Sequence, residues 1–242
     1  MIEHRAAALI IFWHLVRDMK VVGPVCFGAV AILIAIFLAG DADLTILYAP
    51  AVPEDGFKDK VVWITGASSG IGAALAMDLV NMNAKVILSA RRVDKLNEVA
   101  SNCRGDHKPY VLPLDMVDLK SHQTAYDEII KEYGKIDIIV LNAGRSQRNP
   151  AIDTKFEDTK ALMDLNFLSC VHLAKVVLPD MVSNGNGQIV LMSSISAHIA
   201  TPIASSYSAS KFALVIFYVS CWLLNILTLA FTTARILRFP AQ

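Results

Sequence analysis

The stretch Thr65-Gly66-Ala67-Ser68-Ser69-Gly70-Ile71-Gly72 decides the fold of this chain. It follows the apolar run 61–64 and opens an apolar-periodic segment from Ala73 to Val80. A strand, a glycine-rich turn and a helix in this order bring backbone N–H groups and the positive end of a helix dipole against a pyrophosphate. The stretch therefore predicts a dinucleotide-binding turn.

Each glycine of this turn has an expected role. Gly66 permits a tight bend, Gly70 lets the backbone approach a phosphate closely, and Gly72 lets the helix pack near the strand. The spacing Gly-x-x-x-Gly-x-Gly differs from the Gly-x-Gly-x-x-Gly of many dinucleotide binders. On this motif alone, an ordinary Gly/Ser turn remains the alternative.

The composition limits the function classes. The chain has 242 residues, enough for one domain with attached segments. Its formal net charge is zero and its basic residues are scattered, which argues against nucleic acid as a partner. The four cysteines and six histidines form no paired or metal-ligating motif, so we expect no disulfide framework and no metal site.

The segment Val21–Gly40 contains no charged residue. At about 1.5 Å per residue such a helix is roughly 30 Å long, the thickness of a bilayer core. A buried helix of a soluble protein and a cleaved signal peptide are the alternatives, but the run is too uniformly apolar for the first and too long for the second. We therefore expect a single-pass signal anchor in a membrane. The basic residues before it favour a cytosolic N-terminus and a luminal main domain.

Strand-like and helix-like segments alternate after the anchor. Strands that are apolar on both faces, separated by helices, are typical of a doubly wound parallel α/β sheet of the Rossmann type. The expected strands are 61–65, 86–89, 110–114, 136–141 and 188–192, and the expected helices are 73–80, 94–102, 121–133 and about 159–181.

Arg91 and Arg92 follow the second expected strand. A site that prefers NAD places an acidic residue there to bind the ribose 2′-hydroxyl, whereas two guanidinium groups suit the 2′-phosphate of NADP. The alternative is a solvated helix start with Asp94 as its N-cap. The pair favours NADP(H) as the cofactor.

Tyr207 and Lys211 are four residues apart, so on a helix they share one face. A tyrosine phenol ionises only near pH 10, and a neighbouring lysine ammonium together with a positively charged nicotinamide favours the phenolate. Ser194, at the end of the fifth expected strand, has the reach to bond a substrate oxygen. Asn166, in the long helix, is placed to hold a water or a carbonyl on a proton path to Lys211.

These residues resemble the short-chain dehydrogenase/reductase family. The glycine turn, the triplet Asn142-Ala143-Gly144, Asn166, Ser194 and the Tyr207/Lys211 pair match its pattern in order and spacing from about Lys58 to Leu214. The N-terminal anchor and the stretches 43–47, 62–66 and 88–92 look most like its membrane-bound "member 7" group.

The resemblance implies NADP(H)-dependent interconversion of a carbonyl and an alcohol on a lipophilic substrate such as a retinoid or a steroid. It implies an endoplasmic reticulum membrane, and leaves a homo-oligomer open. The implied catalytic residues are Asn166, Ser194, Tyr207 and Lys211. The implied cofactor-binding residues are Gly66, Ser68, Ser69, Gly70, Ile71, Gly72, Arg91, Arg92, Asp115, Asn142, Ala143, Gly144, Tyr207 and Lys211.

The chain is then expected to divide into five parts: a preamble 1–20, the anchor 21–40, a juxtamembrane linker 41–57, the NADP-binding domain 58–214 and a divergent apolar C-terminus 215–242. The resemblance stops after Leu214. The segment 212–233 is apolar nearly all round, which is typical either of a second membrane span or of an aberrant C-terminal end.

An aberrant end has expected physical consequences. The catalytic helix would lose its amphipathic partner face, and the fifth strand would become an exposed edge. Two alternatives to the oxidoreductase therefore stay open. One is an inactive truncated relative that binds dinucleotide or pairs with intact homologues without turnover. The other is a two-span channel or transporter component, which the absence of charges in both spans disfavours.

Overall fold

The computed structural model describes residues 56–199, 201–221, 228–231 and 234–238. The expected preamble, the anchor and all but the end of the juxtamembrane linker lie outside the described residues, so those expectations stay predictions.

Seven strands in the described part of the chain form one sheet with the order β3-β2-β1-β4-β5-β7-β6. The first five pair in parallel, which confirms the parallel sheet expected from the sequence. The chain reverses its strand order between β1 and β4, the position where doubly wound sheets bind ligands. The strands are β1 (Val61–Thr65), β2 (Lys85–Ser89), β3 (Tyr110–Val111), β4 (Ile138–Leu141), β5 (Gln188–Met192), β6 (Thr228–Phe231) and β7 (Ala234–Arg238).

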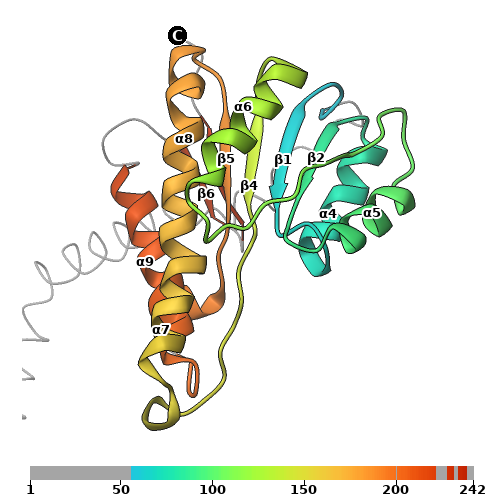
Figure 1. Ribbon diagram of the computed structural model, residues 1–242. Helices are drawn as coiled ribbons and strands as arrows, with labels where there is room; N and C mark the ends of the chain where they lie inside the picture. The colour runs from blue at the N-terminus through green and yellow to red at the C-terminus, as the bar shows by residue number, and fades with distance from the viewer. Residues whose placement is uncertain (1–55, 200, 222–227, 232–233, 239–242) are drawn as a thin grey trace, which may run out of the picture. The chain divides into compact units, whose positions relative to one another are not determined.

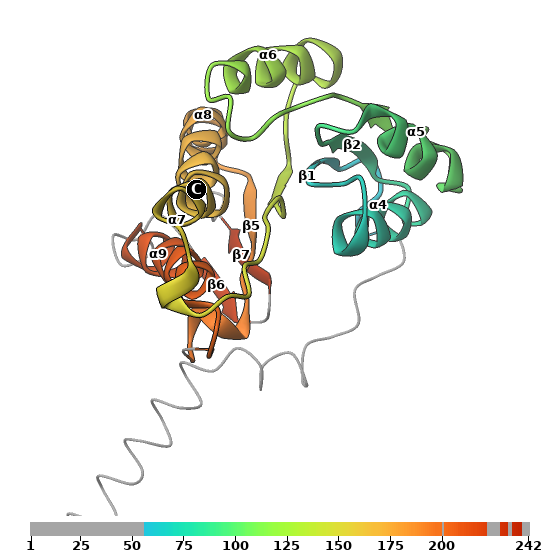
Figure 2. The same ribbon diagram turned by 60° about the horizontal axis from the view of Figure 1, so that its bottom comes forward.

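Helices cover both faces of this sheet (Figures 1 and 2). The helices α4 and α5 pack on one face, whereas α6, α8 and α9 pack on the other. The helices are α4 (Gly70–Asn81), α5 (Val93–Asn102), α6 (Ser121–Tyr133), α7 (Phe156–Met163), α8 (Ser169–Ser183) and α9 (Ser205–Cys221). Short turns η1 (Ala151–Asp153) and η3 (Ile195–Ala197) precede α7 and α9, and a π-helical turn η2 (Asp164–Leu168) joins α7 to α8.

Strand β1 shows why the sheet is buried on both faces. All five of its residues are buried. Val61 and Trp63 pack with α6, α8 and α9, while Val62 and Ile64 pack with α4 and α5. Because successive side chains of a strand point to opposite faces, a strand between two helix layers needs an unbroken apolar run.

The expected element bounds hold closely, with two informative differences. Strand β3 was expected to reach Leu114 but ends at Val111. Pro113 has no N–H and interrupts the regular pattern of hydrogen bonds between β3 and β2. The N–H groups of Leu112 and Leu114 still donate to carbonyls in β2 and directly after it, at 3.0 and 3.1 Å. The long helix runs from Phe156 to Ser183 instead of 159–181, and it contains the π turn η2.

The helical stretch 156–183 is also the one segment of the described residues that is long and apolar enough to cross a membrane. Its α8 part packs against the sheet in the larger core cluster. Its apolar composition is therefore accounted for by core packing.

The C-terminal region corrects the expectation of an exposed fifth strand. Strand β7 pairs antiparallel with β5 from Gln188↔Arg238 to Met192↔Ala234. Strand β6 pairs antiparallel with β7 and so runs in the same direction as β5. The hairpin satisfies the backbone groups that an unpaired edge would expose, and an antiparallel pair needs only the two-residue connection 232–233.

Helix α9 corrects two further expectations. It ends at Cys221 and β6 begins at Thr228, so the segment 212–233 is not a single helix. The helix also keeps a buried face, since Lys211, Leu214, Val215 and Tyr218 are each at most 5% exposed. Leu214 and Tyr218 belong to the core cluster that contains β4 and β5 residues. Helix α9, which carries Tyr207 and Lys211, therefore has packing partners in the core.

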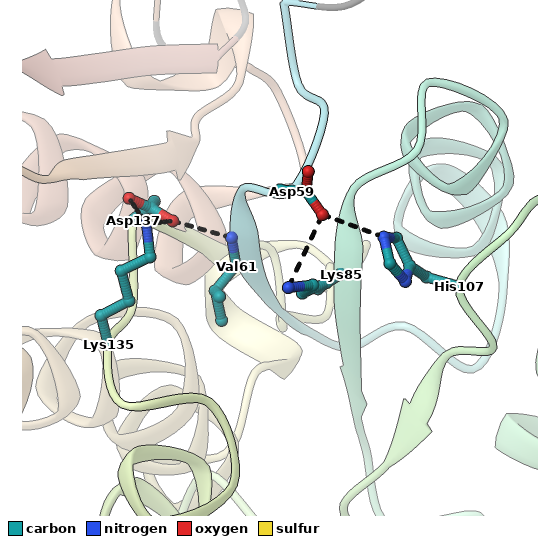
Figure 3. Close-up of polar contacts among 6 residues, drawn as sticks. All are labelled: Asp59, Val61, Lys85, His107, Lys135 and Asp137. Carbon is teal, nitrogen blue, oxygen red and sulfur yellow. Dashed lines mark hydrogen bonds and ion pairs between the residues drawn. The ribbon is translucent and has the colours of Figure 1, made fainter.

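The buried carboxylate of Asp137 connects the segments at the amino ends of β1 and β4 (Figure 3). Its side chain is 4% exposed and forms ion pairs with Lys135 at 3.0 Å and Lys60 at 3.9 Å. It also accepts a hydrogen bond of 2.9 Å from the backbone N–H of Val61. The loop before β4 is thus hydrogen-bonded to the first residue of β1. This bond fixes the register of the two central strands.

We expect Asp137→Ala to lower the free energy of unfolding by about 1–3 kcal/mol, because it leaves the buried Val61 N–H without an acceptor. Asp59→Asn is the control: Asp59 also contacts two side chains, Lys85 and His107, but its own side chain is 58% exposed (Figure 3). Asparagine tolerates its φ of 59°. Urea-dependent proteolysis of the full chain measures both variants, and equal losses would contradict the role given to Asp137.

Candidate active site

A cleft of about 360 Å³ opens at the carboxyl ends of β1, β2 and β4. It is built by four loops that each follow a strand of the sheet, at the point where the strand order reverses. Its lining residues are Gly66, Ser68, Ser69, Ile71, Ala90, Arg91, Arg92, Leu114, Asp115, Met116, Asn142, Ala143, Gly144 and Leu165. Most of the cofactor-binding residues expected from the sequence therefore meet here; Gly70 and Gly72 shape the turn, and Tyr207 and Lys211 line the adjoining pocket.

The glycine turn needs glycine for measurable reasons. Gly66 has φ of +67°, and a Cβ there would lie 2.8 Å from the Cα of Ala143. A Cβ on Gly72 would lie 2.6 Å from Nδ2 of Asn142 and 2.7 Å from the carbonyl oxygen of Gly66. Both separations are far below van der Waals contact. The two loops approach each other so closely that only hydrogen fits between them.

Thr65 and Asn142 hold these loops together with hydrogen bonds. The Thr65 hydroxyl donates to the carbonyl of Val140 at 3.1 Å and accepts from the N–H groups of Asn142 and Ala143 at 3.0 and 3.1 Å. In return, Nδ2 of Asn142 donates to the carbonyls of Thr65 and Gly66 at 2.9 and 3.2 Å. The floor of the cleft is therefore a fixed backbone surface.

The N-terminus of α4 faces this floor without a side-chain cap. Ser69 is the N-cap residue, but its hydroxyl makes no capping hydrogen bond, and the first turn holds no acidic residue. The first N–H groups of a helix have no partner inside the helix. An anion at this end would therefore find free donors and the positive end of the helix dipole.

Arg92 closes one side of the cleft. Its guanidinium donates to the hydroxyls of Ser68 and Ser69 at 3.1 Å each. It is the N-cap residue of α5, while Asp94 lies in the first turn. The alternative that Asp94 caps this helix is therefore wrong. The two serines draw Arg92 toward the glycine turn and away from a purely solvated position.

Asp115 and Met116 form the opposite wall, after β3. A carboxylate oxygen of Asp115 accepts from the N–H of Val117 at 3.1 Å. Nε2 of the fully buried His122 lies 3.1 Å from the Met116 carbonyl, so this nitrogen carries the proton. Its Nδ1 lies 3.0 Å from Nδ1 of His172. Burial, and secondly His172, lower the pKa of His122. The sequence reasoning missed this histidine pair.

A second pocket of about 170 Å³ continues the cleft, since Ile71, Asn142 and Gly144 line both. Tyr207 and Lys211 of α9 line it, which confirms that the two side chains share one face of a helix. Its other lining residues are Arg145, Ser146, Met192 and Ser193.

Lys211 is nearly buried, at 5% exposed, and donates to the carbonyl oxygen of Met192 at 2.7 Å. Burial lowers the pKa of the Lys211 ammonium. A Cβ on Gly144 would lie 3.6 Å from its Nζ, so the loop after β4 passes directly over this lysine. The ammonium is thus fixed between the end of β5 and the floor of the cleft.

Ser194 is not among the lining residues of this pocket. Its hydroxyl accepts from the N–H of Ser196 at 3.2 Å and caps the short turn η3. The neighbouring Ser193 lines the pocket instead, and its hydroxyl oxygen is buried without a hydrogen-bond partner among the described residues. The sequence pattern placed the serine at the correct strand end but could not fix which hydroxyl faces the pocket.

Asn166 is fully buried in the π turn, and both the oxygen and the nitrogen of its side-chain amide form hydrogen bonds. Its Oδ1 accepts from the N–H of Arg145 at 3.0 Å, and its Nδ2 donates to the Arg145 carbonyl at 2.9 Å and to the Ser210 hydroxyl at 3.0 Å. The side chain therefore fastens the loop after β4 to α9. Asn166 thus holds a backbone carbonyl, that of Arg145, and the expected proton path from it to Lys211 stays a prediction.

The family model for short chain dehydrogenases matches residues 60–222. The chain belongs to the short-chain dehydrogenase family. Over 186 residues it is 44% identical to mouse "Dehydrogenase/reductase SDR family member 7" and equally so to the human protein of that name. These matches cover 74% of this chain and 55% of each relative, so the chain spans about half the length of the curated relatives it matches.

Solved structures of short-chain dehydrogenases share this fold. A metagenomic short-chain oxidoreductase in complex with NADP has a TM-score of 0.65 and 28% identity, over 68% of this chain and 76% of that chain. A short-chain dehydrogenase from Streptomyces avermitilis has a TM-score of 0.64 and 30% identity, over 67% of this chain and 59% of that chain.

The cleft of this short-chain dehydrogenase fits a nicotinamide dinucleotide. Its lining residues Gly66, Ser68 and Ser69 lie beside the uncapped N-terminus of α4, where helix N–H groups suit a pyrophosphate. The pocket of Tyr207 and Lys211 adjoins this cleft and shares Ile71, Asn142 and Gly144 with it. When bound, the nicotinamide would supply or accept the hydride of the reaction.

Proposed function

We propose that this protein is a membrane-anchored oxidoreductase that interconverts a carbonyl and an alcohol on a lipophilic substrate with NADP(H). One observation carries the proposal: two adjoining pockets share Ile71, Asn142 and Gly144, and Arg91 and Arg92 line the first while Tyr207 and Lys211 line the second. A cation pair for a phosphate and an acid–base pair for a carbonyl thus lie along one bound molecule.

The preference for NADP(H) rests on Arg92. Because Ser68 and Ser69 hold its guanidinium beside the glycine turn, little side-chain entropy remains to be lost when a phosphate binds. A guanidinium forms charge-assisted and often bidentate hydrogen bonds with phosphate, and these are the strong ones. Arg91 adds a second cation to the same wall.

We expect Arg92→Ala to weaken NADPH binding about ten- to a hundredfold, because a charge-assisted contact is worth about 1.5–3 kcal/mol, and to leave NADH binding almost unchanged. Quenching of nucleotide fluorescence by the full chain measures both affinities. Arg104→Ala is the control, since Arg104 is exposed in the loop after α5 and does not line the cleft. Equal weakening of both nucleotides would give Arg92 a structural role instead.

At the other end of the cleft, Tyr207 is the proposed acid–base. In the reducing direction its hydroxyl gives a proton to the substrate oxygen, and in the oxidising direction the phenolate takes it back. The Lys211 ammonium stabilises the phenolate and binds the nicotinamide ribose. Ser194 is proposed to orient the substrate oxygen, with Ser193 as the hydroxyl that lines the pocket. Asn166 supports the relay by fixing the loop that covers Lys211.

We expect Tyr207→Phe to remove most turnover and to spare NADPH binding, because only the transferable proton is lost. NADPH consumption with a panel of lipophilic ketones and aldehydes, in membranes free of homologous enzymes, measures turnover. Tyr110→Phe serves as the control, because Tyr110 bonds Glu128 away from the cleft. Turnover that survives Tyr207→Phe would overturn the assignment.

The second candidate is an inactive relative that binds dinucleotide, or pairs with intact homologues, without turnover. The chain spans about half the length of the curated relatives it matches, so the activity of the whole relatives is not carried over to it. The same assay separates the two. NADPH binding without consumption of any carbonyl would support this candidate, and turnover by the 242-residue chain would remove it.

The membrane anchor is proposed from the charge-free run Val21–Gly40. We expect the full chain to remain in the membrane pellet after alkaline carbonate extraction, and a chain lacking residues 1–42 to be released. An endoplasmic reticulum marker should co-sediment with the full chain. Release of the full chain by carbonate would overturn the anchor, whatever the enzymatic result.

A further inference from the structure

We propose that Arg145 makes this protein select carbonyl substrates that carry a carboxylate on an apolar body. The inference rests on the proposed function and names the substrate class of the same site. It starts from the position of Arg145, which directly follows the triplet 142–144 and lines the pocket that holds Tyr207 and Lys211.

The backbone of Arg145 is held as firmly as that of a strand residue. Both its N–H and its carbonyl are bonded to the amide of Asn166, at 3.0 and 2.9 Å, and Asn166 is fully buried. The Cα of Arg145 is therefore fixed at the edge of the pocket. The residue is exposed, and it lines the pocket beside Tyr207, within reach of a ligand bound there.

This guanidinium has no ion-pair or hydrogen-bond partner in the described part of the chain. Arg92 differs, because two serines already bind it at the other end of the cleft. Arg145 does not line that first pocket. Its position therefore makes a group on the substrate, rather than a phosphate of the cofactor, the expected binding partner of Arg145.

The charges around the second pocket have one sign. Arg145 and Lys211 are its ionisable cations, and no carboxylate is among its lining residues. A concave surface lined by one sign of charge raises the local concentration of ligands of the opposite sign. The oxidised nicotinamide would add a further positive charge. A substrate carboxylate would neutralise this field and take a bidentate pair of hydrogen bonds from Arg145.

For the apolar part of the substrate the pocket has two apolar lining residues, Ile71 and Met192. Ile195, Ile199 and Ile203 are 65%, 64% and 55% exposed, and they lie on the segment that joins Ser193 to α9. That segment connects two lining residues of the pocket, Ser193 and Tyr207. An amphiphilic keto acid or hydroxy acid fits a pocket that is lined by Arg145 and by the apolar side chains of Ile71 and Met192.

The test compares benzoylpropionate with benzoylpropionamide, which share the reacting ketone and differ only in the charge. We expect the full chain in membranes to show a higher kcat/KM for the acid with NADPH. Arg145→Gln should lower kcat/KM for the acid about ten- to a hundredfold, mainly through KM, and leave the amide nearly unchanged. Arg145→Lys should recover part of the loss, because it keeps the charge but not the bidentate geometry.

Arg148→Gln is the matched control. It removes the same charge three residues later, from an exposed arginine that does not line the pocket, and should change neither substrate. Equal kcat/KM for acid and amide, or equal losses in Arg145→Gln and Arg148→Gln, would overturn the inference. Weaker NADPH binding by Arg145→Gln would overturn it too, since Arg145 would then belong to the cofactor.

Equilibrium dialysis of both probes against the chain with bound NADPH separates this inference from the proposed function. If neither probe is reduced, tighter binding of the acid that Arg145→Gln abolishes would still support the anion site, while the oxidoreductase proposal alone would fail. Equal binding of acid and amide in that case would overturn the anion site.

Discussion

The contact between two backbone loops is the constraint on which the rest of this structure depends. The turn after β1 meets the loop after β4 so closely that a Cβ on Gly66 would lie 2.8 Å from the Cα of Ala143. The Thr65 hydroxyl and the Asn142 amide then bond across the contact. Because the floor is made of backbone, its shape does not depend on side-chain rotamers, and the uncapped end of α4 is left open to an anion.

Asn166 connects the floor of the cleft to helix α9, which carries Tyr207 and Lys211. Its amide spans the backbone of Arg145 and the hydroxyl of Ser210, so one buried side chain connects the loop after β4 with α9. It lies in a π turn, where the wider helix gives a side chain room to reach a neighbouring loop. The position of the loop that lines the second pocket therefore depends on the hydrogen bonds of Asn166. The shape of the glycine turn depends instead on glycines that let two loops approach closely.

A hairpin of β6 and β7 completes the edge of the sheet beside β5. Strand β6 keeps the direction of the parallel sheet, and β7 turns back and inserts between β6 and β5. The carbonyl of Met192 in β5 accepts from Lys211. Pairing of β5 thus fixes the carbonyl that accepts from Lys211, which links the edge of the sheet to the second pocket.

The local patterns in the sequence were enough to predict the parallel core, because two-sided apolar strands and the glycine turn are properties of neighbouring residues. Strands β1 and β5 and helix α6 have the predicted bounds. The pairing of Tyr207 with Lys211 was equally local, since helical spacing sets it. Contacts between distant segments could not be read this way. Only the tertiary structure brought Arg145 to Asn166, turned Ser193 toward the pocket in place of Ser194, and paired β7 with β5. Each depends on how chain segments far apart in sequence meet in space, which no periodicity encodes.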